Sequence, residues 1–162
     1  MRQKHRHLLL VLNIIAIVLI LCFIFGNSMA SKKESSQQST TVSNLIRPIL
    51  YPVVDLLSAQ PVTNQLLHTV VRKTAHFVEF AALAVFSTLL LYQLRGTWRT
   101  HCLAYVLFGT LLSAVTDEFI QSLTERGSRV TDVVLDFSGA LTGILLTVLL
   151  AEWIRHLLRN KP

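Results

Sequence analysis

The sequence predicts an all-α integral membrane protein, a bundle of four transmembrane helices with a short extracytoplasmic interfacial helical segment. Of its 162 residues, 52% are hydrophobic and only 15% are charged, which is typical of a membrane protein. The apolar residues form four stretches, namely Leu8 to Phe25, Phe77 to Tyr92, Cys102 to Val115 and Val133 to Trp153. The first and last can each cross a hydrocarbon core of about 30 Å, whereas the middle two need their flanking polar turns. We therefore expect one membrane domain over residues 1–162.

The first transmembrane helix is predicted at about residues 8–26. Arg2 to His7 and the small residues of Ser28-Met29-Ala30 resemble the two ends of a cleavable signal peptide. However, the apolar run from Leu8 to Phe25 is longer than the roughly 7 to 15 residues of a signal peptide's apolar region. We therefore interpret this segment as an uncleaved membrane anchor.

Residues 27–65 are predicted to form an extracytoplasmic loop. Its first part, Ser28 to Ser43, is rich in Ser, Thr, Gln and Lys and has no hydrophobic period, which is typical of an exposed loop. In Leu45 to Leu67 apolar residues recur, but prolines break any long helix. Short helical pieces on the outer membrane surface agree with this pattern, and a plain cap over the bundle agrees with it equally well.

Three further transmembrane helices are predicted, at about residues 66–94, 101–123 and 130–155. Thr63 and Asn64 are suitable N-cap residues for the first of these, and Gly96 marks its end. In the last helix, Gly139 and Gly143 form a G-x-x-x-G pair, which permits close packing against a neighbouring helix.

The distribution of cations predicts that both termini are cytoplasmic. A net charge of +6 would suggest nucleic acid as the partner of a soluble chain, but here the cations flank apolar stretches, so we expect no nucleic-acid partner. An N-terminus in the cytoplasm places eight of the 15 Lys and Arg residues inside, which alone decides little. The short segments that flank the apolar stretches indicate the orientation more clearly. The two termini and the Arg95 to Arg99 turn contain several cations and only one acid, Glu152.

Ionisable residues gather in three stretches that this topology brings to the outer membrane boundary: Arg72 to Phe80, Asp117 to Gln121 and Arg126 to Asp136. A charge in hydrocarbon costs on the order of 2.5 to 3.5 kcal/mol on insertion scales, so these residues need a reason to be there. Helical spacing gives each stretch one polar face. The candidate catalytic residues are His76, Glu79, Asp117, Glu118 and Asp136. The candidate binding residues are Lys73, Gln121, Arg126, Arg129 and Asp132.

Anion recognition is the function that the cations of these stretches favour. Arg72, Lys73, Arg126 and Arg129 could hold a phosphate or a carboxylate near the outer leaflet, and arginine offers bidentate geometry. We expect an apolar groove below them to receive an acyl or isoprenoid chain. The expected partner is therefore a membrane lipid or a lipid-linked cell-wall precursor.

Other chemistry is compatible with the same residues. Charged residues at helix ends also pair simply to hold a bundle together. The adjacent carboxylates of Asp117 and Glu118 repel each other, and such pairs serve in proton transfer or cation binding. A metal site would use His76 with Glu79, Glu118 and Asp136. Because the cluster holds a single histidine, we predict no cofactor and leave a divalent metal open.

Together the three stretches resemble the VanZ-like family of bacterial membrane proteins. The residues that match its K-x-x-H-F-x-E-aromatic element are Lys73, His76, Phe77, Glu79 and Phe80. Its D-E-x-x-Q element is matched by Asp117, Glu118 and Gln121, and its R…D-V-x-x-D-x-x-G element by Arg126, Asp132, Val133, Asp136 and Gly139. Phe25 with Ser28 resembles the family's end of the first helix. Thr124-Glu125 replace the usual Pro-Gly, so either Arg126 or Arg129 fills the place of the motif arginine.

The resemblance implies a role in the cell envelope of a bacterium of Gram-positive type. The namesake of the family is associated with low-level resistance to teicoplanin, a lipid-tailed glycopeptide. A contribution to lipoglycopeptide resistance or envelope homeostasis is therefore expected, with an extracytoplasmic polar pocket that recognises an anionic lipid or the antibiotic. The alternative is a membrane-embedded enzyme, with or without a metal, that acts on a lipid-linked envelope substrate. The resemblance defines no reaction.

Overall fold

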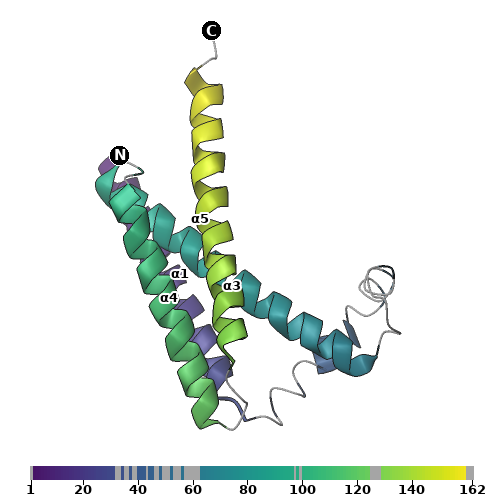
Figure 1. Cartoon of the computed structure of the whole chain (residues 1–162). Helices are drawn as coiled ribbons and strands as arrows, with labels where there is room; N and C mark the ends of the chain where they lie inside the picture. Colours follow the sequence, from purple (N-terminus) through teal and green to yellow (C-terminus); the bar gives the residue numbers. More distant parts are fainter. Residues whose placement is uncertain are drawn as a thin grey trace.

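The fold consists of long helices. The computed structural model describes residues 2–31, 63–96, 98, 100–124 and 129–159, with positions 34, 37, 40–42, 44, 45, 48, 52 and 56. Its long helices are α1 (Arg2–Met29), α3 (Asn64–Arg95), α4 (Thr100–Leu123) and α5 (Val130–Arg159) (Figure 1). Each is long and apolar enough to cross a membrane. The predicted all-α membrane bundle is thereby confirmed.

The helix bounds follow the predicted ones most closely in the middle of the chain. α3 and α4 begin and end within two residues of the expected positions. α1 instead runs from Arg2 to Met29 rather than from about 8 to 26, and α5 continues to Arg159 rather than to about 155. The helices continue into their polar flanks because helical backbone keeps its own hydrogen bonds satisfied on either side of the membrane boundary.

The segment after α1 differs from the predicted loop. The described positions 34, 37 and 40–42 are helical and exposed, so the expectation of a loop up to Ser43 is wrong there. Ser31 and Glu34 form a capping box: the Ser31 N–H donates to Glu34 Oε2 (2.9 Å), and the Glu34 N–H donates to Ser31 Oγ (3.3 Å). The Ser31 N–H and the Ser31 hydroxyl both donate to Glu34 Oε2, and these two hydrogen bonds lower the pKa of the Glu34 carboxyl. The interfacial pieces expected in Leu45 to Leu67 lie mostly outside the described residues.

Both ends of α3 carry the predicted caps. The hydroxyl of Thr63 accepts a hydrogen bond from the Leu66 N–H (3.2 Å) at the start of the helix. At its end Gly96 adopts a left-handed conformation with φ of 70° and donates its N–H to the Tyr92 carbonyl (2.7 Å).

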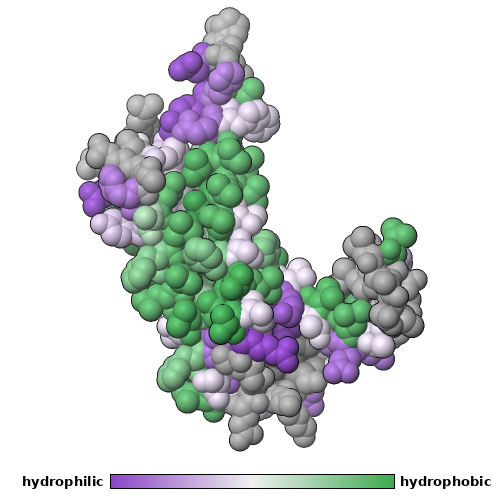
Figure 2. Space-filling view, in the orientation of Figure 1, coloured by the Kyte–Doolittle hydropathy of each residue, from purple (hydrophilic) through white to green (hydrophobic). Residues whose placement is uncertain are grey.

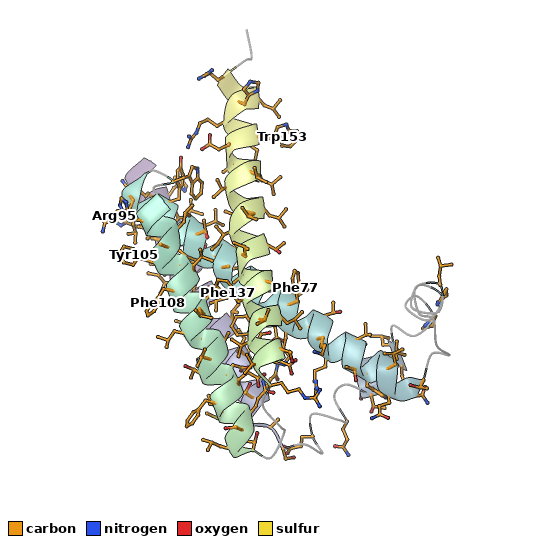
Figure 3. All side chains as sticks on the ribbon, viewed as in Figure 1. Phe77, Arg95, Tyr105, Phe108, Phe137 and Trp153 are labelled. Atoms are coloured by element: carbon orange, nitrogen blue, oxygen red, sulfur yellow. The ribbon has the colours of Figure 1, made fainter. Side chains whose placement is uncertain are left out.

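Among the four long helices, α3 and α5 share the most extensive contact, and Phe77 and Phe137 flank their crossing in Figure 3. A Cβ atom at Gly139 would collide with the backbone carbonyl of Phe77, and one at Gly143 with that of Ala81. Neither carbonyl can move aside without bending α3. The predicted role of the G-x-x-x-G pair is confirmed, and its partner is α3.

The bundle has two chemically different ends. At the basic end, where α1 begins and α5 ends, Arg6 donates to the Gln93 carbonyl (3.0 Å) and Arg155 pairs with Glu152 (3.0 Å). Arg155 also donates to the Tyr92 hydroxyl (2.9 Å). Figure 2 shows an apolar band beneath the hydrophilic groups of this end. The opposite end, where α1 and α4 finish and α5 begins, is called the polar end below (Figure 1).

Candidate functional site

Three ionisable side chains from three helices meet near the polar end. The Nδ1 atom of His76 on α3 lies 3.8 Å from Asp117 Oδ2 on α4 and 3.8 Å from Asp136 Oδ1 on α5. One possible ligand atom from each of the three residues lies within 4.8 Å of the other two. The Asp117 and Asp136 side chains are 0% and 1% exposed, and that of His76 is 17% exposed. We call these three residues the acid–imidazole centre.

Close packing of α5 on α3 creates this centre. Gly139 lies three residues after Asp136, one turn along the same face of α5, and contacts the backbone of Phe77. Phe77 is the residue next to His76 in α3. The absence of a side chain at Gly139 therefore lets Asp136 approach the imidazole.

The two carboxylates of the centre have different surroundings. Asp117 accepts hydrogen bonds at both oxygens, from the Ser28 hydroxyl at the end of α1 and from Gln121 Nε2 (2.7 Å). Among the described residues, neither carboxylate oxygen of Asp136 has a hydrogen-bond partner. Hydrogen bonds thus fix the orientation of Asp117, whereas Asp136 lacks such fixation among the described residues.

The structure places the other two predicted acids outside the centre. Glu118 is 4% exposed, and its Oε2 accepts the backbone N–H of Arg129 (2.9 Å) at the start of α5. An acid at this position fits the positive N-terminal end of a helix, and it ties α4 to α5. Glu79 is partly buried on α3, one turn beyond His76, and does not belong to the group of possible metal ligands.

Above the centre, towards the polar end, α3 and α5 share an ion pair. Lys73 Nζ lies 2.8 Å from Asp132 Oδ1, with side chains 38% and 20% exposed. Arg72 and Arg129 are exposed. Arg126 lies outside the described residues, so the structure does not decide which arginine fills the motif position.

An apolar layer closes the centre on its other side. Ile24, Phe80 and Ala114 are fully buried and pack together one turn below Ser28, His76 and Asp117. Beyond this layer, α1, α3 and α4 border an apolar groove of about 320 Å³, lined among others by Leu21, Leu83 and Gly109. An apolar groove below the polar residues was expected, but the layer separates it from the centre. On the opposite side of the centre, one turn closer to the polar end, lie the partly exposed side chains of Lys73 and Asp132.

Ser28 is the site residue that the sequence reasoning missed. It entered the prediction only through its resemblance to the family's end of the first helix, yet its side chain is fully buried and bonds to Asp117. A local signal existed, since Ser28 lies four residues after Ile24 on the inward face of α1. Its partner, 89 residues away, is set by tertiary packing.

Fold and site together define a multi-pass, all-α membrane protein with a partly buried imidazole and two buried carboxylates near one end of its bundle. The family model described as VanZ/LLP1 matches residues 13–151, and the chain belongs to this family. The resemblance inferred from the three motif stretches is thereby confirmed. No curated protein and no solved structure gave a match.

Proposed function

We propose that the acid–imidazole centre binds a divalent metal ion and, through it, an anionic group of an envelope lipid or lipid-linked cell-wall precursor. The burial of Asp136 and its lack of hydrogen bonds among the described residues are the main support for this proposal. Its carboxylate is buried beside a second buried carboxylate, and neither of its oxygens has a hydrogen bond among the described residues. A buried carboxylate in such surroundings is costly unless it is neutralised or coordinates a cation.

The donor set favours a particular kind of metal. One imidazole nitrogen with carboxylate oxygens suits zinc or manganese better than calcium or magnesium, which prefer oxygen ligands alone. Three protein ligands leave coordination positions for an external ligand, as in catalytic zinc sites. Ser28 and Gln121 would serve as the outer-shell partners that orient a ligating carboxylate. Compared with the ligand set expected from the sequence, Asp117 takes the place of Glu79 and Glu118.

Charge also favours a metal over direct anion binding. Lys73 is already paired with Asp132, and the centre itself contributes two carboxylates against one imidazole. Without a cation, this site repels an anionic headgroup. A bound divalent ion reverses the local charge and lets the site hold a phosphate.

The proposed location of the centre is the outer face of the bacterial cell membrane. Cations flank the apolar spans at the basic end, which the positive-inside rule assigns to the cytoplasm. We expect green fluorescent protein fused after Pro162 to fluoresce and alkaline phosphatase fused there to be inactive. An active phosphatase at this position would place the centre on the cytoplasmic side and exclude contact with an extracellular antibiotic.

We propose that this activity lowers susceptibility to teicoplanin-type lipoglycopeptides. The test is expression of the wild type and two variants in a teicoplanin-susceptible Gram-positive strain, with equal membrane levels checked by immunoblot. We expect wild type and Glu152→Gln to raise the minimum inhibitory concentration, because Glu152 lies at the basic end. Asp136→Asn should give no protection. Protection by Asp136→Asn equal to that of wild type would contradict the proposal.

A further inference from the structure

We infer that Lys73 is the second contact for the ligand of the centre, and that this ligand is the phosphate group of a membrane lipid. The Asp132 carboxylate lies 2.8 Å from Lys73 Nζ, at the position that a phosphate oxygen would take on binding. The inference rests on the proposed metal site and adds to it the class of ligand and the residue that selects it.

The ion pair is placed for this role. Lys73 lies three residues before His76 on α3, and Asp132 lies four residues before Asp136 on α5. At a rise of 1.5 Å per residue, the pair sits about 4.5 to 6 Å further towards the polar end than the centre. The same two helices thus present a cation and, one turn deeper, the metal-binding side chains.

The pair also lies between the centre and the polar end of the bundle. The layer of Ile24, Phe80 and Ala114 closes the opposite side, whereas Lys73 and Asp132 are 38% and 20% exposed. A partly exposed ion pair is weak because water and salt screen it. An incoming dianionic phosphate can therefore displace the Asp132 carboxylate, and a lysine ammonium is a suitable point-charge contact for phosphate.

The surroundings of the pair favour a lipid as the source of the phosphate. Val78 on α3 and Val134 on α5 are 56% and 62% exposed on membrane-crossing helices, each within two residues of a centre residue. These side chains lie about 200° around their helices from His76 and Asp136, so they face outward, and hydrocarbon covers this outer surface of the bundle at nearly the depth of the centre. A lipid whose phosphate reaches the centre can keep its acyl chains in that hydrocarbon. A free phosphate gains nothing from this surface.

The experiment measures binding of dioctanoyl phosphatidic acid to zinc- or manganese-loaded protein in phosphatidylcholine nanodiscs, with inorganic phosphate as competitor. We expect Lys73→Met to weaken lipid binding by about 10- to 100-fold, as for loss of a hydrogen bond to a charged group. The matched control is Arg95→Met, which removes an exposed cation from the last turn of the same helix, at the basic end, and should leave the affinity within about twofold. Asp132→Asn should strengthen binding because it frees Lys73.

The outcomes separate this inference from the proposed function. Equal binding by Lys73→Met and Arg95→Met, or weaker binding by Asp132→Asn, would overturn the role of Lys73. Inorganic phosphate that binds as tightly as the lipid would overturn the assignment to a lipid. The metal content of the same samples is measured as well. If the wild type binds metal but the lipid affinity does not depend on Lys73, this inference alone is wrong. If the wild type binds no metal, the proposed function is wrong. The tighter lipid binding expected for Asp132→Asn is opposite to the effect of Lys73→Met, and misfolding cannot produce tighter binding.

Discussion

Asp136→Asn is expected to raise the thermal stability of the metal-free protein and to abolish its stabilisation by a divalent metal. The Asp136 carboxylate is buried, near Asp117, and without a hydrogen bond among the described residues. An unsatisfied buried group of this kind costs about 1 to 3 kcal/mol, more when it is charged, and the neutral amide removes the charge. A ligand at 100 times its Kd adds about 2.7 kcal/mol to the stability of the protein that binds it. Only the wild type should gain this increment.

Thermal unfolding in detergent, with a chelator and then with zinc or manganese, measures both effects. Glu152→Gln is the matched control, because it makes the same acid-to-amide change on α5 at the exposed basic end. It should follow the wild type under both conditions. A metal-dependent rise in the unfolding temperature of Asp136→Asn equal to that of the wild type would show that Asp136 is no ligand.

Gly139→Ala is expected to destabilise the bundle and to separate Asp136 from His76. The added methyl group would collide with the Phe77 carbonyl, where backbone rather than a flexible side chain must move. Overpacking of this kind costs about 1 to 3 kcal/mol and here outweighs the gain of about 0.5 to 1 kcal/mol from replacing glycine in a helix. Metal affinity should fall with stability, because the same displacement opens the centre.

Gly109→Ala is the control for this prediction. A Cβ atom at Gly109 meets nothing within 4 Å, so the substitution keeps the gain in helix propensity without a collision. We expect its unfolding temperature to equal or exceed that of the wild type, with metal affinity unchanged. If Gly139→Ala unfolds at the same temperature as Gly109→Ala, the close crossing of α3 and α5 does not hold the centre together.

Local spacing predicted the parts of the site that lie on single helices. Asp117 and Gln121 are four residues apart and share the predicted polar face of α4, where the structure joins them by a hydrogen bond. Glu118 has almost the same local sequence context, but it points to the Arg129 backbone instead. Which of two adjacent acids faces the centre depends on the rotation of α4 within the bundle, and apolar residues surround both.

Pairing across helices was less accessible to sequence reasoning. Three partners were conceivable for Asp136, since Lys73, Arg72 and His76 occur on neighbouring turns of α3. The contact of Gly139 with Phe77 fixes the register of α5 on α3, and that register sets Lys73 beside Asp132 and His76 beside Asp136. The helical positions after Ser31 were predicted as a loop because the segment is polar and has no hydrophobic period. Its S-x-x-E capping box, which favours a helix start, was not considered.

The metal content of the wild-type protein tests the central claim most directly. Native mass spectrometry and elemental analysis are applied to protein purified without chelator, and again after chelation and titration with zinc and manganese. The acid–imidazole centre predicts one divalent ion per chain, lost with the chelator and restored on titration. Folded wild-type protein that contains no metal after purification and takes up none on titration would contradict the account.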